Sequence, residues 1–593
     1  MSSYGKHVAV ELTEDNHRQF FIPKGFAHGF AVLSETAVFQ YKCNNFYHPE
    51  ADGSISILDD SLGINWKIPT EHANLSEKDT KHALFKDFDS PFDTHQLILS
   101  NIFDMFTTDN NIYIGGTNVL LEWGKVPTDK SDLSEDKLKE IRSTVIERIQ
   151  KMFRDYLELD NVSFLFGTGS SIHLGAASIQ NIPLSVEDEI VENKDVDISN
   201  DFKIYVQKLQ ANKIACMNKG DIVTDANGWT YSFDGDYYRN CDVNEKDVDG
   251  KKQKVVDEYG EIDVPLETLL NYLIANLYVA EAEQDEENVK RLQKLIAAIK
   301  KAMFNLCDVH LRTTKDSDLK RINNKGYEDI FKKDKYIFHE KFLKSLLQRP
   351  LNLKRANIFT SNYDLAFEYA FDNIGVKYID GFSGFHHRYF KPETFDYDIF
   401  YPGSTTSGKV QRIEKVVRYF KLHGSITWVK DYDLNASNVY GIKELPIDLI
   451  KANGDDVSFN YGDLMIYPSA VKKSYTLDLP YSELIRQFSC AISQPQSVLF
   501  AVGYSFCDEH FNDIIYQALS NPSFTLIIVN FQKSEKSEEI KRLRDLKDPR
   551  IIILEGNDLG DFLTFSTELM PNFADASSSE EVTKTLESLL KKE

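Results

Sequence analysis

Six short apolar runs constrain the fold of this chain more than any other feature of its sequence. They are rich in β-branched and aromatic residues, and patterns typical of helices lie between several of them. Nearly continuous apolar strands that alternate with helices are typical of a parallel sheet covered on both faces. The sequence therefore predicts an α/β fold with a doubly wound parallel sheet. The runs are VSFLFG (162–167), ANIFT (356–360), VVRYFKL (416–422), SVLFAVG (497–503), TLIIVN (525–530) and RIIIL (550–554).

The length of the chain, 593 residues, exceeds what one hydrophobic core usually serves. Short alternating apolar runs separated by turn residues predict a β module near the start of the sequence. Two strongly amphipathic helices within residues 264–307 predict a helical insertion, which we place at 185–330. The expected segments are a β module over 1–90, a junction over 91–132, the α/β domain over 133–565 and a polar tail over 566–593.

Composition narrows the expected partners and location. The chain carries 68 basic and 92 acidic residues, a formal charge of −24, so direct binding of nucleic acid is not expected. The first residues resemble no leader peptide, and no apolar run approaches the roughly 20 residues of a membrane-spanning helix. We therefore expect a cytoplasmic protein without a membrane partner. None of the six cysteines forms the CxxC pair of a zinc ribbon, so no metal is expected.

The loop Gly167-Thr168-Gly169-Ser170-Ser171 follows the first of these strands. Glycines at such a place let the backbone approach a pyrophosphate, and a following helix offers unpaired N–H groups and the positive end of its dipole. The loop is therefore typical of a Rossmann-like dinucleotide site. A tight turn without a ligand explains the glycines equally well, and Ser170 and Ser171 are also ordinary helix-capping residues.

Two further strands end in polar residues. Thr360, Asn362 and Asp364 follow one strand, and His423 follows the next, with Gly424 beside it. Because the carboxyl ends of parallel strands meet at one edge of a sheet, we expect these side chains over the same crevice. Taken singly, Asn362 and Asp364 fit helix caps and His423 fits a structural histidine. Three polar strand ends in one sheet favour a ligand site.

Together these motifs resemble the sirtuin family over residues from about 155 to 565. Its GAGxS loop corresponds to 167–171, its TQNxD motif to 360–364 and its HG motif to 423–424. A later GTS-type segment corresponds to residues 502–506, and the strand that ends in a ribose-binding Asn corresponds to the strand ending in Asn530. Two departures disfavour lysine deacylation, because the zinc ribbon of the deacylases is absent and Ser361 replaces the Gln of TQNxD.

The remaining pattern resembles the sirtuin-like NADases of bacterial antiphage defence. That resemblance implies an enzyme that hydrolyses NAD, its substrate, to nicotinamide and ADP-ribose and so depletes the infected cell. It implies that Asn362 orients a water or the ribose hydroxyls and that His423 is the general base. The residues that it implies bind the dinucleotide are Gly167, Thr168, Gly169, Ser170, Ser171, Thr360, Asp364, Gly503, Ser505 and Asn530.

The strings PKGFAHGF (23–30) and LSEKD (75–79) resemble the C-terminal half of dTDP-4-dehydrorhamnose 3,5-epimerase, a cupin-type β-barrel. The resemblance implies that His28 lines a sugar-nucleotide site, that Tyr41 is the proton donor and that Asp79 supports the catalytic His. A base and an acid on opposite faces of a sugar suit epimerisation beside a ketone. The RGLH-like string that carries the base in that family does not occur in this sequence, so we expect a partial cupin-type module.

Several alternatives to the NADase hypothesis stay open. The site would serve equally as a non-hydrolytic sensor of NAD or ADP-ribose, and the first module favours a role related to dTDP-rhamnose synthesis. Deacylation and ADP-ribosyl transfer are further alternatives. For an NADase of this kind we expect a homo-oligomer, or an ATPase or other defence-system partner, that controls the activity. The insertion at 185–330 is the expected contact surface.

Overall fold

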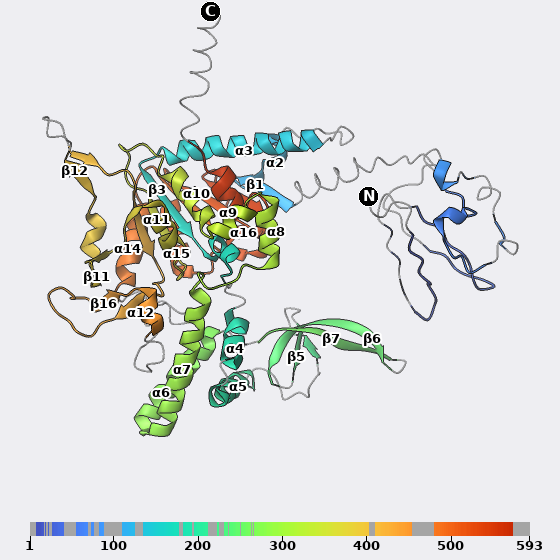
Figure 1. The fold of residues 1–593 in the computed structure, drawn as a ribbon, viewed down its shortest axis with the longest axis horizontal. Helices are drawn as coiled ribbons and strands as arrows, with labels where there is room; N and C mark the ends of the chain where they lie inside the picture. Colours follow the sequence, from blue (N-terminus) through green and yellow to red (C-terminus); the bar gives the residue numbers. More distant parts are fainter. Residues whose placement is uncertain are drawn as a thin grey trace, which may run out of the picture. The chain divides into compact units, whose positions relative to one another are not determined.

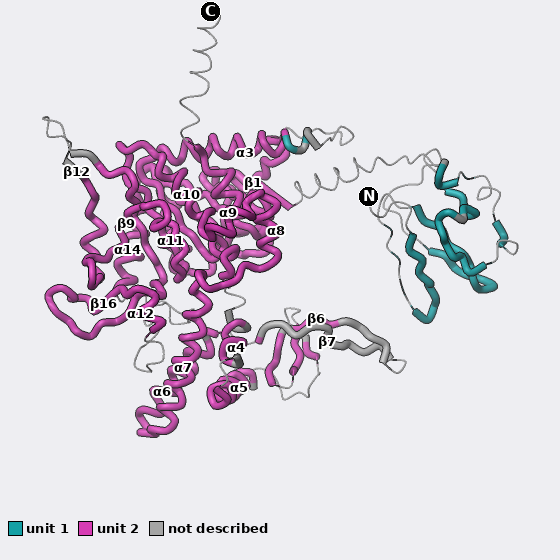
Figure 2. Tube along the Cα trace, in the orientation of Figure 1, with its two compact units in different colours: residues 1–104, 127–139 teal, residues 105–126, 140–593 magenta. Residues whose placement is uncertain are grey.

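The computed structural model describes residues 7–40 and 55–87 with gaps, 109–124, 135–176, 182–211 without 193 and 194, 222–262 with gaps, 264, 266–402, 410–452 and 479–572. The chain divides into two compact units, which Figure 2 shows in different colours. The first unit comprises Met1–Asp104 and Pro127–Lys139, and the second comprises Met105–Val126 and Glu140–Glu593.

The second unit is built around a nine-stranded sheet with the order β2-β1-β19-β18-β17-β3-β8-β14-β9. All six apolar runs form strands of this sheet, and they pair in parallel. The predicted α/β fold with a largely parallel sheet is therefore confirmed. The strands are β1 (Asn110–Ile114), β2 (Thr117–Asn118), β3 (Asn161–Phe166), β8 (Asn357–Thr360), β9 (Lys377–Ile379), β14 (Val416–Lys421), β17 (Ser497–Val502), β18 (Thr525–Asn530) and β19 (Ile551–Gly556).

The sheet is mixed, and so the prediction of a wholly parallel sheet was wrong at one edge. β1 pairs antiparallel with both β19 and β2. A tight turn at Gly115 and Gly116, both with positive φ, joins β1 to β2, and such turns connect antiparallel strands. The polar residues of NNIYI gave no apolar run, which is why this edge was assigned to the junction between modules.

The order of the parallel strands places a switch point in the middle of the sheet. From β3 the chain first adds β8 on one side, and later returns to add β17 on the other side. In open α/β sheets, ligands bind at the carboxyl ends of the strands that flank such a reversal. The loops that follow β3, β8 and β17 therefore lie where a ligand is expected.

Helices cover both faces of the sheet, because alternate residues of a strand point to opposite sides. Phe164 and Phe166 of β3 belong to a core shared with α3 (Glu135–Leu157), α10 (Ile337–Leu346) and α11 (Ala366–Ile374). Leu165, between them, belongs to the opposite core, shared with α14 (Tyr481–Ile492), α15 (Glu509–Leu519) and α16 (Glu538–Asp545). The apolar stripe predicted for α3 is confirmed, since Ile141, Val145, Ile149 and Phe153 are all buried.

The segment between β3 and β8 is helical, as predicted, but it also contains a sheet. The paired helices α6 and α7 (Figure 1) share an apolar core with α4 and α5. Four antiparallel strands were missed, because β6 and β7 are highly charged and show no regular apolar alternation. These elements are α4 (Ile182–Glu192), α5 (Val196–Ala211), β4 (Ile222–Thr224), β5 (Thr230–Phe233), β6 (Tyr238–Val248), β7 (Lys251–Ile262), α6 (Leu266–Glu283) and α7 (Glu286–Cys307).

Smaller elements complete the second unit. Strands β10, β11, β16 and β15 form a four-stranded sheet in that order, and β12 pairs with β13. The helices are α2 (Leu120–Trp123), α8 (Asp316–Asn324), α9 (Glu328–Lys333), α12 (Ile447–Ala452), α17 (Phe562–Thr564) and the π-helix η11 (Phe565–Leu569), with 3-10 turns at η7 (Thr168–Ser170), η8 (Ile172–Leu174), η9 (Pro392–Asp396) and η10 (Ser534–Lys536). The strands are β10 (Phe382–Ser383), β11 (Arg388–Phe390), β12 (Phe400–Pro402), β13 (Val410–Arg412), β15 (Trp428–Lys430) and β16 (Ile442–Glu444).

In the first unit, the described part of residues 7–87 contains two 3-10 turns, η2 (Asp60–Leu62) and η5 (Phe85–Asp87), and no named strand. The cupin-type β module therefore stays a prediction. Across both units, none of the helices that the structure describes is long and apolar enough to cross a membrane.

Candidate functional site

Four neighbouring strands end level with one another at the carboxyl edge of the sheet. Val502 of β17 pairs with Phe166 of β3, Phe166 pairs with Thr360 of β8, and Thr360 pairs with Lys421 of β14. Adjacent strands lie about 4.8 Å apart. The four loops that follow these residues therefore begin side by side, and they are the loops that carry the sequence motifs.

The loop after β3, which contains Gly167, and the loop after β17, which contains Gly503, pack backbone against backbone. Gly167 N–H donates to Val502 O at 3.1 Å, and Gly169 N–H donates to Gly503 O at 2.9 Å. A Cβ on Gly169 would lie 2.6 Å from Gly503 Cα, and a Cβ on Gly167 would lie 2.6 Å from Gly503 O. Gly503 itself has a φ of +60°. These three glycines are thus required by the contact between the loops, whether or not a pyrophosphate lies above them.

The Gly167 loop turns differently from the expected helix start. Residues 168–170 and 172–174 form short 3-10 turns, and the next α-helix begins only at Ile182. The Ser170 hydroxyl donates to Gly167 O at 2.8 Å, and no side-chain cap forms at the start of either turn. Within the described residues, no α-helix begins at this loop, so no helix dipole is directed at it. The N–H groups of Gly167, Gly169, Ser170 and Ser171 already donate to backbone carbonyls, so an anion there would be held by the remaining N–H groups of the turns.

Asn362 joins the loop after β8 to the Gly167 loop. Its Nδ2 group donates to Gly167 O at 3.1 Å, Ser171 Oγ at 3.2 Å and Ser170 Oγ at 3.3 Å. Its own N–H donates to Thr360 Oγ1 at 3.0 Å, and that hydroxyl donates to Phe166 O. The side chain is 8% exposed. Because Nδ2 faces the loop residues, the amide oxygen is the group turned away from them.

Asp364 precedes Leu365, the N-cap residue of α11, and so is not the cap itself. Its Oδ1 accepts from Ala366 N–H at 3.0 Å, in the first turn of α11. Burial raises the pKa of this carboxyl, while Lys421, the Ala366 N–H and the Ser171 hydroxyl lower it. Asp364 therefore ties α11 to the Gly167 loop through Ser171, and its place below Asn362 suits a support for that residue.

His423 lies two residues beyond Lys421, as Asn362 lies two residues beyond Thr360, the partner of Lys421 in the sheet. The imidazole is 5% exposed and stacks on Phe511 of α15, with the ring centroids 5.2 Å apart. Its Nε2 atom lies 3.8 Å from Asp508 Oδ1, in the loop after β17. At that separation the two side chains form an ion pair when the imidazole is protonated. Asp508 was not among the predicted site residues.

The predicted ribose-binding residues lie further out. Ser505 is exposed, and its hydroxyl contacts Cys507 Sγ at 3.1 Å. Asn530 ends β18, the strand beyond β17, and its Nδ2 group donates to Gln532 O at 2.7 Å. Neither contacts Asn362 or His423 in the described structure. His28 belongs to the first unit, and Tyr41 and Asp79 lie outside the described residues.

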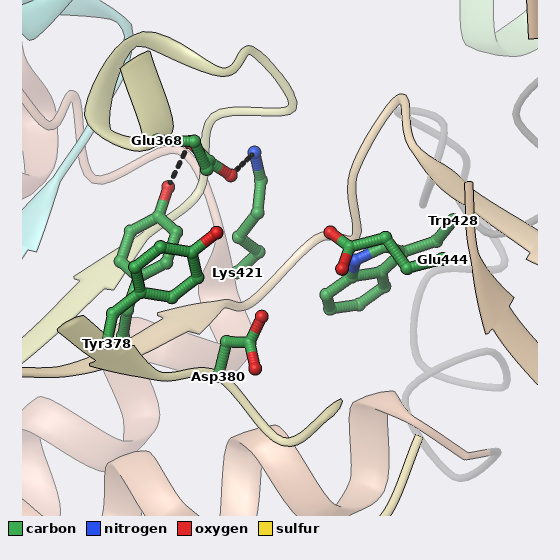
Figure 3. A pocket seen from close by; sticks show the side chains of 7 residues that line it. Glu368, Tyr378, Asp380, Lys421, Trp428 and Glu444 are labelled. Carbon is green, nitrogen blue, oxygen red and sulfur yellow. Dashed lines mark hydrogen bonds and ion pairs between the residues drawn. The ribbon is translucent and has the colours of Figure 1, made fainter. Parts of the chain in front are cut away.

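A buried polar cluster near the His423 loop was not predicted from the sequence. Lys421, 3% exposed, pairs with Glu368 of α11 at 2.9 Å, and Tyr419 donates to the same carboxylate at 3.1 Å. A signal was present, since Tyr419 and Lys421 alternate on one face of β14. A small pocket beside them is lined by Glu368, Tyr378, Asp380, Tyr419, Lys421, Trp428 and Glu444 (Figure 3).

The carboxyl groups of this pocket are held out of water. Burial raises the pKa of Glu444 to about 7, with Asp380 adding to the shift and Arg388 opposing it. Arg388 bridges the two acids, at 2.7 Å from Asp380 and in contact with Glu444. Within the described residues, no group of three or more His, Cys, Asp or Glu side chains is placed to hold a metal ion.

Two histidines behind the Gly167 loop lie in apolar surroundings. His173 of η8 and His339 of α10 have ring centroids 5.6 Å apart and pack among Phe338, Phe367 and Phe562. None of their ring nitrogens has a hydrogen-bond partner among the residues that the structure describes. Burial lowers the pKa of His339 to about 3 and holds the pKa of His173 well below its usual value. Both rings are neutral near pH 7.

Comparison with known proteins gives two matches on this chain. The family model for dTDP-4-dehydrorhamnose 3,5-epimerase matches residues 2–87, and the model for SIR2-like domains matches residues 356–552. The second match contains the Asn362 and His423 motifs and the Gly503 loop.

Several curated proteins that match this chain are dTDP-4-dehydrorhamnose 3,5-epimerases. The dTDP-4-dehydrorhamnose 3,5-epimerase of Escherichia coli K12 is 52% identical over 79 residues, which are 13% of this chain and 42% of that protein. The enzyme of the same name from Methanothermobacter thermautotrophicus is 45% identical over 78 residues, and that from Shigella flexneri is 46% identical over 87 residues. The match spans 42%, 42% and 47% of these three proteins. The chain thus carries a segment of the epimerase family at residues 2–87 and a SIR2-like domain at residues 356–552.

Proposed function

We propose that the second unit is an NAD glycohydrolase, which cleaves NAD to nicotinamide and ADP-ribose. The observation that carries this proposal is the matched position of Asn362 and His423, each two residues beyond the paired ends of neighbouring strands. The match to SIR2-like domains over both motifs supports NAD as the substrate. The switch point of the sheet, between β3 and β17, supports a dinucleotide across the same edge.

The chemistry of the N-glycosidic bond between nicotinamide and ribose assigns the roles of Asn362 and His423. Nicotinamide leaves as a neutral ring from a pyridinium, so the developing positive charge stays on the ribose and no oxyanion forms. The site must hold the ribose and deliver water to its anomeric carbon. The amide oxygen of Asn362, fixed by the three bonds from Nδ2, would orient the water or a ribose hydroxyl. His423 would take the proton from the water, oriented by Asp508.

The phosphates would lie over the Gly167 and Gly503 loops. These loops touch through Gly169 N–H and Gly503 O, and Thr168 and Gly169 are only half-buried. Ser505, exposed beside them, and Asn530, at the end of the next strand, would extend the site toward the adenosine ribose. Backbone N–H groups in such turns bind anions without a basic side chain.

A role in antiphage defence follows from the proposed reaction, because unrestrained hydrolysis of NAD stops cell metabolism. The activity would then need a control, supplied by self-association, an ATPase or another defence-system partner. The segment between β3 and β8 is a suitable contact surface. Its helix α7 reaches the site, since Phe304 packs against Leu365 and Ile426, which follow the two motifs directly.

The segment that matches the epimerases favours a second candidate function, the epimerisation of a dTDP-4-keto sugar. The identity of 52% over 79 residues supports it. Incubating the protein with dTDP-4-keto-6-deoxyglucose in deuterated water tests it, because an epimerase would exchange the protons at C3 and C5.

The main proposal is tested by incubating the purified chain with NAD in ¹⁸O-labelled water, with and without the proteins encoded beside it. Hydrolysis predicts equal amounts of nicotinamide and ADP-ribose, with one ¹⁸O atom in the ADP-ribose. Binding of NAD without release of nicotinamide would support the sensor alternative and contradict hydrolysis. Unlabelled ADP-ribosyl products would indicate transfer to another acceptor.

A further inference from the structure

Lys421 links the two strand ends that carry the catalytic motifs. It is the last residue of β14, two positions before His423, and its side chain is 3% exposed. The ammonium group donates to Tyr363 O at 3.2 Å and also to Asp364 O. Both carbonyls belong to the loop that begins with Asn362. One side chain of the His423 strand therefore holds the backbone of the Asn362 loop.

A second contact joins the same two segments. Ile426 N–H, three residues beyond His423, donates to Tyr363 O at 3.3 Å. Tyr363 O thus accepts hydrogen bonds from one residue before His423 in the chain and from one residue after it. The ring of Tyr363 in turn lies 6.2 Å from the imidazole of His423, centroid to centroid. The loop between Asn362 and α11 is therefore held against the β14 segment at several points, and Lys421 supplies the charged one.

The charge of Lys421 is balanced within the same cluster. Glu368, in the first turn of α11, accepts from Lys421 Nζ at 2.9 Å and from the Tyr419 hydroxyl at 3.1 Å. A buried ammonium group is stable only when it is paired and hydrogen-bonded. An apolar residue at position 421 would avoid the free-energy cost of burying a charge altogether. The hydrogen bonds from the ammonium group to two loop carbonyls offset this cost. With an apolar residue at position 421, both carbonyls would lose this donor.

We propose that Lys421 is a positioning residue, whose ammonium group fixes the Asn362 loop relative to His423 through Tyr363 O and Asp364 O. Glu368 and Tyr419 hold the ammonium group in place for this task. The catalytic meaning of the inference rests on the proposed NAD hydrolysis. The tether itself does not, because it can be measured as protection of the loop backbone.

The test uses the full chain and removes the tether without leaving an unpaired charge. In the double variant Lys421→Met with Glu368→Gln, both charges disappear and the side-chain sizes are nearly kept. We expect a folded protein in which the amides of residues 361–366 exchange hydrogen about tenfold faster, because loop protection falls when two bonds are lost. We expect kcat for nicotinamide release to fall by about 100-fold, with the KM for NAD changed less than about threefold.

A matched control is Lys415→Met, an exposed lysine just before the same strand. It should leave both the exchange and kcat at the wild-type values. If the first double variant does not fold, Lys421→Gln with Glu368→Gln keeps polar atoms in the cluster, yet its amide is too short to reach both carbonyls. Faster exchange in that variant supports the tether equally.

The outcomes separate the inference from the proposed function. If either folded variant shows wild-type exchange at residues 361–366, the tether is wrong, whatever the activity. If exchange rises but kcat stays at the wild-type value, the positioning role is wrong. If the wild-type protein releases no nicotinamide while exchange rises in the variant, the tether stands and the proposed hydrolysis fails. A rise in KM with unchanged kcat would also overturn the positioning role.

Discussion

The side-chain amide of Asn362 donates a 3.1 Å hydrogen bond to the carbonyl of Gly167, across 195 residues of sequence. This bond joins the loop after β8 to the loop after β3, and the contact between Gly169 and Gly503 joins the loop after β17 to the loop after β3. Three motifs that are far apart in the chain thus form one continuous backbone surface. Their order in the sheet follows from the reversal between β3 and β17.

Replacing Asn362 by Ala should reduce nicotinamide release by about 100-fold or more, because the group that orients the water is lost. The three hydrogen bonds to the Gly167 loop are lost as well, so a decrease in unfolding free energy of about 1 kcal/mol is expected. Asn373→Ala, on the exposed side of α11, is the control and should leave the rate unchanged. A stable Asn362→Ala protein with the wild-type rate would exclude the proposed role.

Replacing His423 by Ala should lower kcat by roughly 10²–10⁴-fold, the range typical for removal of a general base. Asp508→Asn should give a smaller loss in the same direction, since the imidazole keeps its stacking on Phe511 but loses the nearby carboxylate. The exposed His386, at the tip of the β10–β11 hairpin, provides the control His386→Ala. An unchanged kcat in His423→Ala would show that His423 is not the general base.

Gly169→Ala tests the contact between the Gly167 and Gly503 loops. The new Cβ would lie 2.6 Å from Gly503 Cα, so the loops must separate, at a cost of about 1–3 kcal/mol. Gly326→Ala is the comparison, because its φ of +75° gives a strain of about 1–2 kcal/mol with no atom within 4 Å of the new Cβ. Both variants should melt at lower temperature. Only Gly169→Ala should also lose NAD hydrolysis, and equal activities would argue against a ligand over these loops.

The buried histidines predict a loss of stability in acid. His339 has a folded-state pKa of about 3, below the ordinary value of 6.5, so the unfolded state binds a proton first as the pH falls. The stabilisation is complete above pH 6.5 and is lost as the pH falls from 6.5 toward 3. Between pH 6.5 and pH 5 the loss is about 2 kcal/mol for this residue.

Urea unfolding at pH 7 and pH 5 measures this effect. In His339→Met, which removes the titrating group and keeps an apolar side chain of similar size, the difference between the two pH values should shrink by about 2 kcal/mol. His386→Met, at an exposed site, should leave the difference as it is in the wild type. The same pH dependence in His339→Met and wild type would mean that His339 does not titrate below its ordinary range.

The apolar runs were sufficient to predict the central sheet, because strands buried on both faces leave a strong signal in one sequence. All six runs became parallel strands, and the stripe on α3 faces the core as expected. β1 and β2 were missed because NNIYI pairs at an edge, where one polar face is tolerated. β6 and β7 were missed because their sequences are highly charged and show no regular apolar alternation.

The sequence predicted that the motif loops meet at one edge of the sheet, and it missed the residues that support these loops. Gly167, Asn362 and His423 each follow an apolar strand, so the topology rule for parallel sheets was enough to group them. Asp508 and Glu368 lie on helices or loops whose placement depends on tertiary packing, and no spacing in the sequence relates them to the motifs. The helix expected after the Gly167 loop is replaced by 3-10 turns, because Gly175 takes a φ of +90° and ends the second turn.

The rate of nicotinamide release from NAD by the full chain, compared with that of His423→Ala under the same conditions, tests the central claim most directly. The proposed function predicts release by the wild-type protein, alone or with the proteins encoded beside it, and a loss of about 100-fold or more in the variant. Equal rates in the two proteins, or a wild-type protein that leaves NAD intact under every one of these conditions, would contradict it.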